Sequence, residues 1–365
     1  MTVQLKESVN KLLQEGTAIP ALPLALKEDR SFDEFRQRVL VNYYLDAGVG
    51  GLAVGVHTTQ FNIRDPKFNL YEKILRIASE EIEAVIGDTP FIKIAGVCGG
   101  TEQALLEAEL AVKYNYDIAL LSMGGLHHYT EEQLLERTEA VAKIIPVFGF
   151  YLQPNAGGRI LSYEFWERFM RIEGVVGVKT APFNRYQTID VIRAVCSSPR
   201  WKDIAIYTGN DDNIVPDLMT VYAFNIDGEV RRKEIIGGLL GHWAVWTSKA
   251  VALLKEVKEA KKNQTNFSRL LTEGIKVTDC NAAFFDVKNQ FAGCIPGINE
   301  VLARQGLLAG SWCLDEQEVL GPGQKEEIDR VYREYPELND DAFVKANLQK
   351  WEKMVEERLC LRKGE

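Results

Sequence analysis

An excess of positive charge is the first thing this sequence lacks. Its 365 residues carry 43 Lys and Arg against 52 Asp and Glu, which gives a formal net charge of −9. A protein with that balance has no surplus of cations to neutralise a phosphate backbone, so we expect no nucleic acid partner. The longest basic cluster, residues 255–262, is interrupted by Glu256 and Glu259 at helical spacing and indicates a solvated helix face.

Long apolar runs and paired cysteines are also missing. No stretch approaches 18 uncharged apolar residues, and the first 16 residues contain no apolar leader core. The sequence therefore predicts a cytoplasmic protein with no membrane partner. The six cysteines form no CxxC pair, which favours reduced, mostly buried thiols over disulfides or zinc ligands.

What the sequence does contain is a repeat of short apolar, β-branched runs with amphipathic segments between them. Their mean spacing of about 31 residues is the size of a βαβ unit. Continuously apolar strands belong to a parallel sheet covered on both faces, and eight of them with following helices close a (β/α)8 barrel. We therefore predict an α/β fold, a TIM barrel with a C-terminal helical extension. The predicted strands are 18–24, 51–56, 91–97, 118–122, 147–151, 175–179, 204–208 and 235–240.

An open doubly wound sheet is the alternative fold. Residues 48–53 match the dinucleotide-binding pattern G-x-G-x-x-A, but these glycines end a helix and open a strand. A dinucleotide loop must instead leave a strand and enter a helix. The barrel is therefore the preferred fold, and we expect no cofactor.

The pattern also divides the chain. Residues 1–16 are an N-terminal extension, 17–265 the barrel and 266–365 a helical region, because the strand-helix rhythm stops near residue 265. A helical region of this size either caps the barrel or forms a subunit interface, and we expect a homo-oligomer, a dimer or a tetramer. Its predicted helices are 265–277, 298–305, 325–334 and 341–359.

The reactive groups of such barrels come from the carboxyl ends of the strands. The fifth and sixth predicted strands end alike, in GFY at 149–151 and GVK at 177–179, so we expect Tyr151 and Lys179 to lie at one height. Burial lowers the pKa of a lysine, and a neutral amine can form a Schiff base with a carbonyl while a phenol shuttles protons. A structural ion pair for Lys179 and a hydrogen-bonded core phenol for Tyr151 are the alternatives.

Polar groups also follow the second strand. The backbone amides of Val56 and His57 and the hydroxyls of Thr58 and Thr59 form a candidate loop for a substrate carboxylate.

The seventh strand exits through a glycine and an acidic pair. Gly209 would let a ligand approach the backbone closely. We expect Asp211 and Asp212 to cap the next helix.

Five segments together resemble a known family: AIPALPL at 18–24, DAGVGGL at 46–52, GFYLQP at 149–154, VGVK at 176–179 and YTGND at 207–211. Over about residues 17 to 330 the chain is similar to the dihydrodipicolinate synthase and N-acetylneuraminate lyase family of class I aldolase-type barrels. The resemblance implies that Lys179 forms the Schiff base and that Tyr151 relays the proton.

Departures from the family pattern argue against dihydrodipicolinate synthase itself. The family's Gly-Thr-Thr-Gly-Glu stretch is replaced at residues 55–60, which puts Val56 and His57 where the two threonines belong. The tyrosine that the synthases lend from a neighbouring subunit falls near residues 125–128 and is absent. The usual Gly-Arg pair after the tyrosine strand is represented only by Arg159, a candidate contact for the carboxylate or the aldehyde.

The leading hypothesis is a cofactor-free lyase or synthase that acts on pyruvate or a related 2-oxo acid, with an aldehyde as second partner, through an iminium on Lys179. The altered loop leaves open a non-catalytic barrel that binds a 2-oxo acid. A metal-dependent lyase would need His57, His127, His128 and His242, but they show no His-x-His or His-x-x-x-His spacing, so we expect no metal site.

Overall fold

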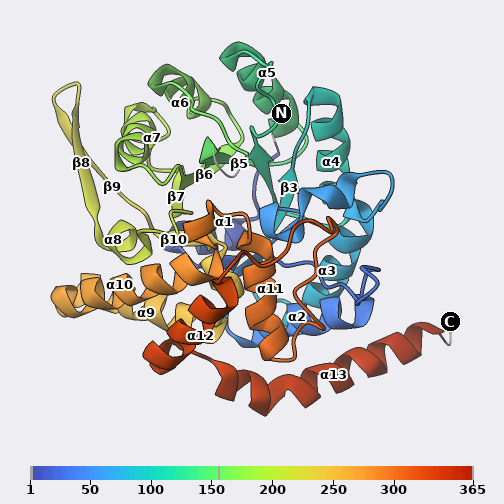
Figure 1. The fold of residues 1–365 in the computed structure, drawn as a ribbon. Helices are drawn as coiled ribbons and strands as arrows, with labels where there is room; N and C mark the ends of the chain where they lie inside the picture. The colour runs from blue at the N-terminus through green and yellow to red at the C-terminus, as the bar shows by residue number, and fades with distance from the viewer. Residues whose placement is uncertain (1–2, 155–156, 364–365) are drawn as a thin grey trace.

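Eight parallel strands form the centre of the molecule, as the sequence predicts (Figure 1). The computed structural model describes residues 3–154 and 157–363. Buried side chains fill most of each strand, a pattern typical of a parallel sheet covered on both faces. The strands are β1 (Ala18–Pro20), β2 (Gly51–Val54), β3 (Ile92–Val97), β4 (Ile118–Ser122), β5 (Val147–Leu152), β6 (Val175–Ala181), β7 (Ala205–Thr208) and β10 (Gly237–Leu240).

The sheet closes on itself. Neighbouring strands follow the order β1, β10, β7, β6, β5, β4, β3, β2. The two ends meet where Ala21 bridges Ala53 and where the N–H of Leu22 donates to the carbonyl of Ala53 at 2.8 Å. The structure therefore confirms the (β/α)8 barrel.

A helix follows each barrel strand, and local sequence signals fix several helix starts. Thr130 forms a capping box with Gln133, and the side chains of Ser162 and Asn184 accept hydrogen bonds from the first turns that follow them. The barrel helices are α2 (Glu34–Asp46), α3 (Tyr71–Ile86), α4 (Thr101–Lys113), α5 (Glu131–Ala142), α6 (Tyr163–Phe169), α7 (Arg185–Ser197), α8 (Ile214–Met219) and α9 (Thr247–Asn263).

The N-terminal segment closes the end of the barrel where the strands begin. Val9 and Leu13 of helix α1 (Glu7–Glu15) pack against side chains of the barrel interior, such as Ile94 and Phe148. The hydroxyl of Tyr207 on β7 donates to the carbonyl of Leu13 at 3.0 Å. The candidate active site, described below, lies at the opposite end of the barrel, where the strands finish.

A hairpin that the sequence analysis did not predict lies between α8 and β10. Strands β8 (Val221–Ile226) and β9 (Glu229–Glu234) pair antiparallel and project beside α7 and α8 (Figure 1). Asp227 and Gly228 join them, both with positive φ, which is the Asp-Gly signal of a tight hairpin turn.

The C-terminal region is helical, as predicted, and lies against the barrel of its own chain (Figure 1). Trp351 packs on Tyr43 of α2 with ring centroids 5.7 Å apart, and its Nε1 donates to Asp46 at 2.7 Å. Over residues 3–154 and 157–363, no helix has the length and apolar character needed to cross a membrane. The helices are α10 (Phe267–Phe284), α11 (Cys294–Arg304), α12 (Gln324–Glu334) and α13 (Asp341–Lys363).

Candidate active site

A bulge in strand β6 decides which side chains of β5 and β6 face the barrel interior. The pairing of the two strands shifts by one residue near their start, which leaves Val176 without a partner. Beyond the bulge, Lys179 lies opposite Phe150 instead of Tyr151. Because successive side chains of a strand point to opposite faces, this single residue puts Lys179 and Tyr151 on opposite sides of the sheet.

The predicted position of Tyr151 beside the lysine is therefore wrong. Its ring packs on Trp166 of α6 with centroids 5.0 Å apart, and its hydroxyl accepts a long hydrogen bond, 3.5 Å, from the N–H of Leu161. The side chain is 2% exposed and lies between sheet and helix, outside the cavity described next. Tyr151 is in the position of the core phenol that the sequence analysis held as the alternative.

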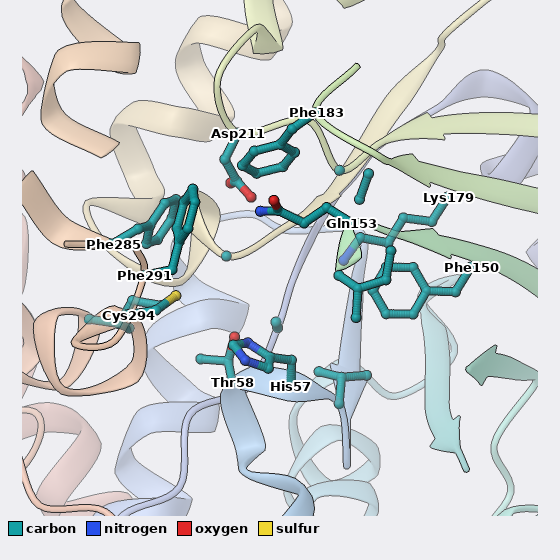
Figure 2. Close-up of a pocket in the computed structure, with 17 residues that line it drawn as sticks. His57, Thr58, Phe150, Gln153, Lys179, Phe183, Asp211, Phe285, Phe291 and Cys294 are labelled. Atoms are coloured by element: carbon teal, nitrogen blue, oxygen red, sulfur yellow. The ribbon is translucent and has the colours of Figure 1, made fainter. Parts of the chain in front are cut away.

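A cavity of about 110 Å³ lies at the carboxyl ends of the barrel strands, under the C-terminal helical region (Figure 2). Strand ends supply one part of its lining, including Phe150, Lys179 and Asp211. The segment from Phe285 to Ile298 supplies another part. The C-terminal region therefore caps the barrel within one chain, which was one of the two roles expected of it.

Lys179 is the one lysine among the described residues that line this cavity. The loss of water around the amine lowers the pKa of Lys179 to about 8, although the negative charge of Asp211 opposes that shift. Nζ lies 4.3 Å from the ring centroid of Phe150. No carboxylate within the described ranges forms an ion pair with it. A Cβ on Gly209 would come within 2.4 Å of Cε of Lys179, so a side chain at this position would require the lysine to move.

Asp211 faces the same cavity, and hydrogen bonds from residues outside the cavity lining fix its position. Burial raises the pKa of Asp211 to about 7, against the opposing effect of Lys179. One carboxylate oxygen accepts the N–H of His242 at 3.0 Å, and the backbone carbonyl accepts Nδ2 of Asn281 at 2.7 Å. Nδ1 of His242 in turn donates to Oδ1 of Asn281 at 2.5 Å. Figure 2 shows the Asp211 carboxylate and the amine of Lys179 turned toward the cavity.

The expected capping role of the acidic pair is wrong. The N-cap of α8 is Asn213, and its side chain makes no capping hydrogen bond. Asp211 belongs to the cavity lining, whereas Asp212 is exposed.

Some residues of the loop after β2 line the cavity, and others form hydrogen bonds within the barrel. Val56, His57 and Thr58 line the cavity. Burial, with the charge of Lys179, lowers the pKa of His57 to about 4, so its ring is neutral near pH 7. Thr59 does not reach the cavity, because its hydroxyl donates to the carbonyl of Leu22 at 2.6 Å and accepts the N–H of residue 55 at 3.1 Å.

Arg159 is also a structural residue, contrary to the expectation. Its Nη1 donates to the carbonyls of Leu126 and Tyr129, at 2.8 and 2.9 Å, and so ties the loop after β5 to the loop after β4. It is not part of the cavity lining. Asn155 and Ala156, which precede it in the same stretch, lie outside the described residues.

The four histidines do not gather at one place. His57 lines the cavity, His242 is buried behind Asp211, and His127 and His128 lie on the loop after β4. Within the described part of the chain, no group of three or more His, Cys, Asp or Glu side chains could hold a metal ion.

Several lining residues were not found by sequence reasoning. Gln153 and Phe183 follow strands β5 and β6, two and four residues beyond the predicted strand ends at residues 151 and 179. Phe285, Phe291 and Cys294 come from the region beyond the barrel, and no local motif marks them.

Comparison with known proteins agrees with this architecture. The model of the dihydrodipicolinate synthetase family matches residues 15–225, more than half of the chain. The chain belongs to this family. The match includes the strand that carries Lys179 and confirms the resemblance described above.

Relatives with assigned activities are distant and match in part. The 4-hydroxy-tetrahydrodipicolinate synthase of Nitratidesulfovibrio vulgaris is 28% identical over 189 residues, which cover 51% of this chain and 61% of the relative. That of Thiobacillus denitrificans is 24% identical over 203 residues, covering 55% and 65%. This chain thus spans less than two thirds of the length of these relatives.

Solved structures of the family share the fold. Dihydrodipicolinate synthase from Oceanobacillus iheyensis superposes with a TM-score of 0.70 at 17% identity, covering 90% of this chain and 99% of that one. N-acetylneuraminate lyase from Fusobacterium nucleatum gives 0.67 at 18% identity, covering 88% and 99%.

Proposed function

We propose that this protein is an aldolase-type lyase or synthase that forms a Schiff base between Lys179 and pyruvate or a related 2-oxo acid. The observation that carries the proposal is an amine with a pKa of about 8 that faces the cavity at the carboxyl ends of the strands and has no carboxylate partner within ion-pair distance in the described ranges. At pH 7 about a tenth of such an amine is neutral, against about three in ten thousand for an ordinary lysine. The neutral form is the nucleophile.

The substrate carboxylate has a defined place in this scheme. Among the described lining residues, Lys179 is the only Lys or Arg. Its amine becomes the iminium nitrogen, so it is not available as a separate ammonium group to bind the carboxylate. The carboxylate is therefore held by the amide N–H groups of Val56 and His57 and by the hydroxyl of Thr58. A neutral His57 neither repels the nearby lysine nor adds a second fixed charge.

Asp211 is the proton-transfer group in place of the displaced phenol. Nζ of Lys179 attacks C2 of the 2-oxo acid, and water leaves as the iminium forms. The Asp211 carboxylate takes a proton from C3, which gives the enamine. C3 then bonds to the carbonyl carbon of an aldehyde, and the protonated Asp211 returns its proton to the aldehyde oxygen. Water hydrolyses the iminium and frees the amine, and the reverse sequence is the lyase reaction.

Trapping the iminium tests the proposal. The protein is incubated with pyruvate and borohydride, digested and analysed by mass spectrometry. We expect the reduced adduct on Lys179 and none in Lys179→Ala. Absence of an adduct over a panel of 2-oxo acids would contradict the proposal.

Lys233 is a matched control. Burial lowers its pKa to about 8 as well, but it donates to the carbonyl of Trp201 at 2.7 Å and lies outside the cavity. Lys233→Ala should therefore keep full labelling. An adduct on Lys233 would mean that a lowered pKa alone, without the cavity, explains the chemistry.

A non-catalytic 2-oxo acid-binding barrel is the second candidate. It is favoured by the cavity lining, which includes no tyrosine among the described residues. This alternative predicts a Schiff base with pyruvate but no exchange of the C3 protons with D2O. The lyase predicts both.

A further inference from the structure

Three phenylalanines line the cavity in addition to Phe150. Phe183 follows β6, Phe285 follows α10, and Phe291 lies shortly before α11. Figure 2 shows Phe285 and Phe291 across the cavity from Lys179 and Phe150. An acceptor that approaches the enamine from that side would meet these rings first.

Two of the rings touch in a defined geometry. The centroids of Phe183 and Phe291 are 5.9 Å apart with planes at 70°, an edge-to-face arrangement. Both side chains are only partly buried, so each keeps ring surface that can receive a ligand.

The backbone at both positions is unusual. Phe183 has φ +51° and Phe291 has φ +68°, in the left-handed region that favours glycine. The N–H of Phe183 is held by Oδ1 of Asn210, and that of Phe291 by the carbonyl of Asp286, each at 3.0 Å. Large residues held in strained backbone conformations cluster at ligand sites. The strained backbone points the side chain in a direction that an ordinary conformation would not give, and at a ligand site that direction lets the side chain contact the ligand.

The charges of the cavity narrow the choice of acceptor further. A second carboxylate would find no cation other than Lys179 among the described lining residues. A polyhydroxylated chain needs many hydrogen-bond partners, and the three phenylalanines offer none. With His57, Thr58, Lys179 and Asp211 assigned to the oxo acid, Gln153 and Cys294 are the polar side chains left among the described lining residues. A neutral ring, in contrast, gains both apolar burial and edge-to-face contacts there.

We propose that the second substrate of this site is an aromatic aldehyde, whose ring packs against Phe183 and Phe291. The inference rests on the proposed function, since it assigns the acceptor of the same enamine. Its carbonyl carbon accepts the new bond from C3, and its oxygen takes the proton from Asp211, as in the scheme above.

The test measures condensation with pyruvate by NMR for three aldehydes: benzaldehyde, glyceraldehyde and succinic semialdehyde, which carries a carboxylate. We expect kcat/KM for benzaldehyde to exceed that for the other two by about tenfold or more. Equal values, or a preference for either of the others, would overturn the inference.

Variants of Phe291 show whether the ring carries the preference. Phe291→Leu should remove the advantage of benzaldehyde, whereas Phe291→Tyr should keep it. Phe224→Leu on β8, outside the cavity, is the control and should leave the preference unchanged. A preference that survives Phe291→Leu in a folded protein would contradict the assignment.

Pyruvate alone separates this inference from the proposed function. Borohydride labelling and C3 proton exchange need no aldehyde. If both occur and no aromatic preference is found, the acceptor assignment fails and the Schiff-base proposal stands. If neither occurs, both fail.

Discussion

Strands β5 and β6 carry the same pattern of a glycine, an apolar residue and a polar side chain, yet the two polar side chains point into different parts of the molecule. Lys179 faces the cavity at the mouth of the barrel, whereas Tyr151 packs on Trp166 behind the sheet. The difference is one unpaired residue, Val176, near the start of β6. The place beside the lysine that the pattern assigns to the phenol is occupied by the ring of Phe150.

Two strands with the same sequence pattern therefore need not place the corresponding side chains opposite each other or on the same face of the barrel sheet. Register is a property of the strand pair, and a bulge leaves no mark in a run of valines and glycines. The proposed acid–base group therefore follows β7, because Asp211 faces the cavity and Tyr151 of β5 does not. The predictions below test whether the functional pair is Lys179 with Asp211.

The largest effect is expected from Asp211→Asn. Without a carboxylate, transfer of the C3 proton should slow by about 100- to 1000-fold, measured as hydrogen–deuterium exchange of the pyruvate methyl group by NMR. Asp212→Asn, a change at the exposed neighbour, should leave exchange within about twofold. Exchange in Asp211→Asn near the wild-type rate would remove Asp211 from the mechanism.

The pH dependence of iminium trapping comes next. Because only the neutral amine attacks, the rate should rise about tenfold per pH unit up to the Lys179 pKa of about 8 and level off above it. The Asp211 charge raises the pKa of Lys179, so Asp211→Asn should move the midpoint to lower pH. A midpoint near 10.5, that of an ordinary lysine, would show that the amine is not desolvated.

The two glycines that look equivalent in sequence offer a test of the bulge itself. A Cβ on Gly177 would lie 2.3 Å from the ring of Phe148 and 2.8 Å from the carbonyl of Ala205, whereas one on Gly149 would meet the ring of Phe169 at 2.7 Å. Gly177→Val should cost about 1–3 kcal/mol of unfolding free energy in denaturant titrations. Phe148→Leu should relieve part of this cost but none of that of Gly149→Val. An unchanged unfolding midpoint in Gly177→Val would contradict the register.

The smallest effect is expected from Tyr151→Phe. Its hydroxyl accepts one long hydrogen bond and does not reach the cavity, so C3 exchange should stay within about twofold of wild type. Asp211→Asn, Asp212→Asn and Tyr151→Phe can be compared in one exchange experiment. A loss of about 100-fold in Tyr151→Phe would restore the phenol as the proton relay and make the bulge wrong.

Most of the fold could be predicted from the sequence, because its signals are local. Each barrel strand is a short apolar run, and Lys179 lies near the end of one of them. The hairpin of β8 and β9 was missed, although Asp227-Gly228 is a local turn signal, because the count of eight strands already accounted for the barrel.

The site could be predicted only in part, because side chain direction and distant contacts are not local. Thr59 and Arg159 are polar residues in the right loops, but their hydrogen bonds to backbone carbonyls hold them away from the cavity. Phe291 and Cys294 reach the site from more than 100 residues beyond Lys179. No pattern near either residue relates it to the strand ends.

A crystal structure of the borohydride-reduced pyruvate complex tests the central claim most directly. The account predicts continuous density from Nζ of Lys179 to C2 of the substrate, the carboxylate at the Val56–Thr58 loop, and C3 directed toward Asp211. Density that leaves Lys179 unmodified, or a C3 atom that contacts the phenol of Tyr151, would contradict it.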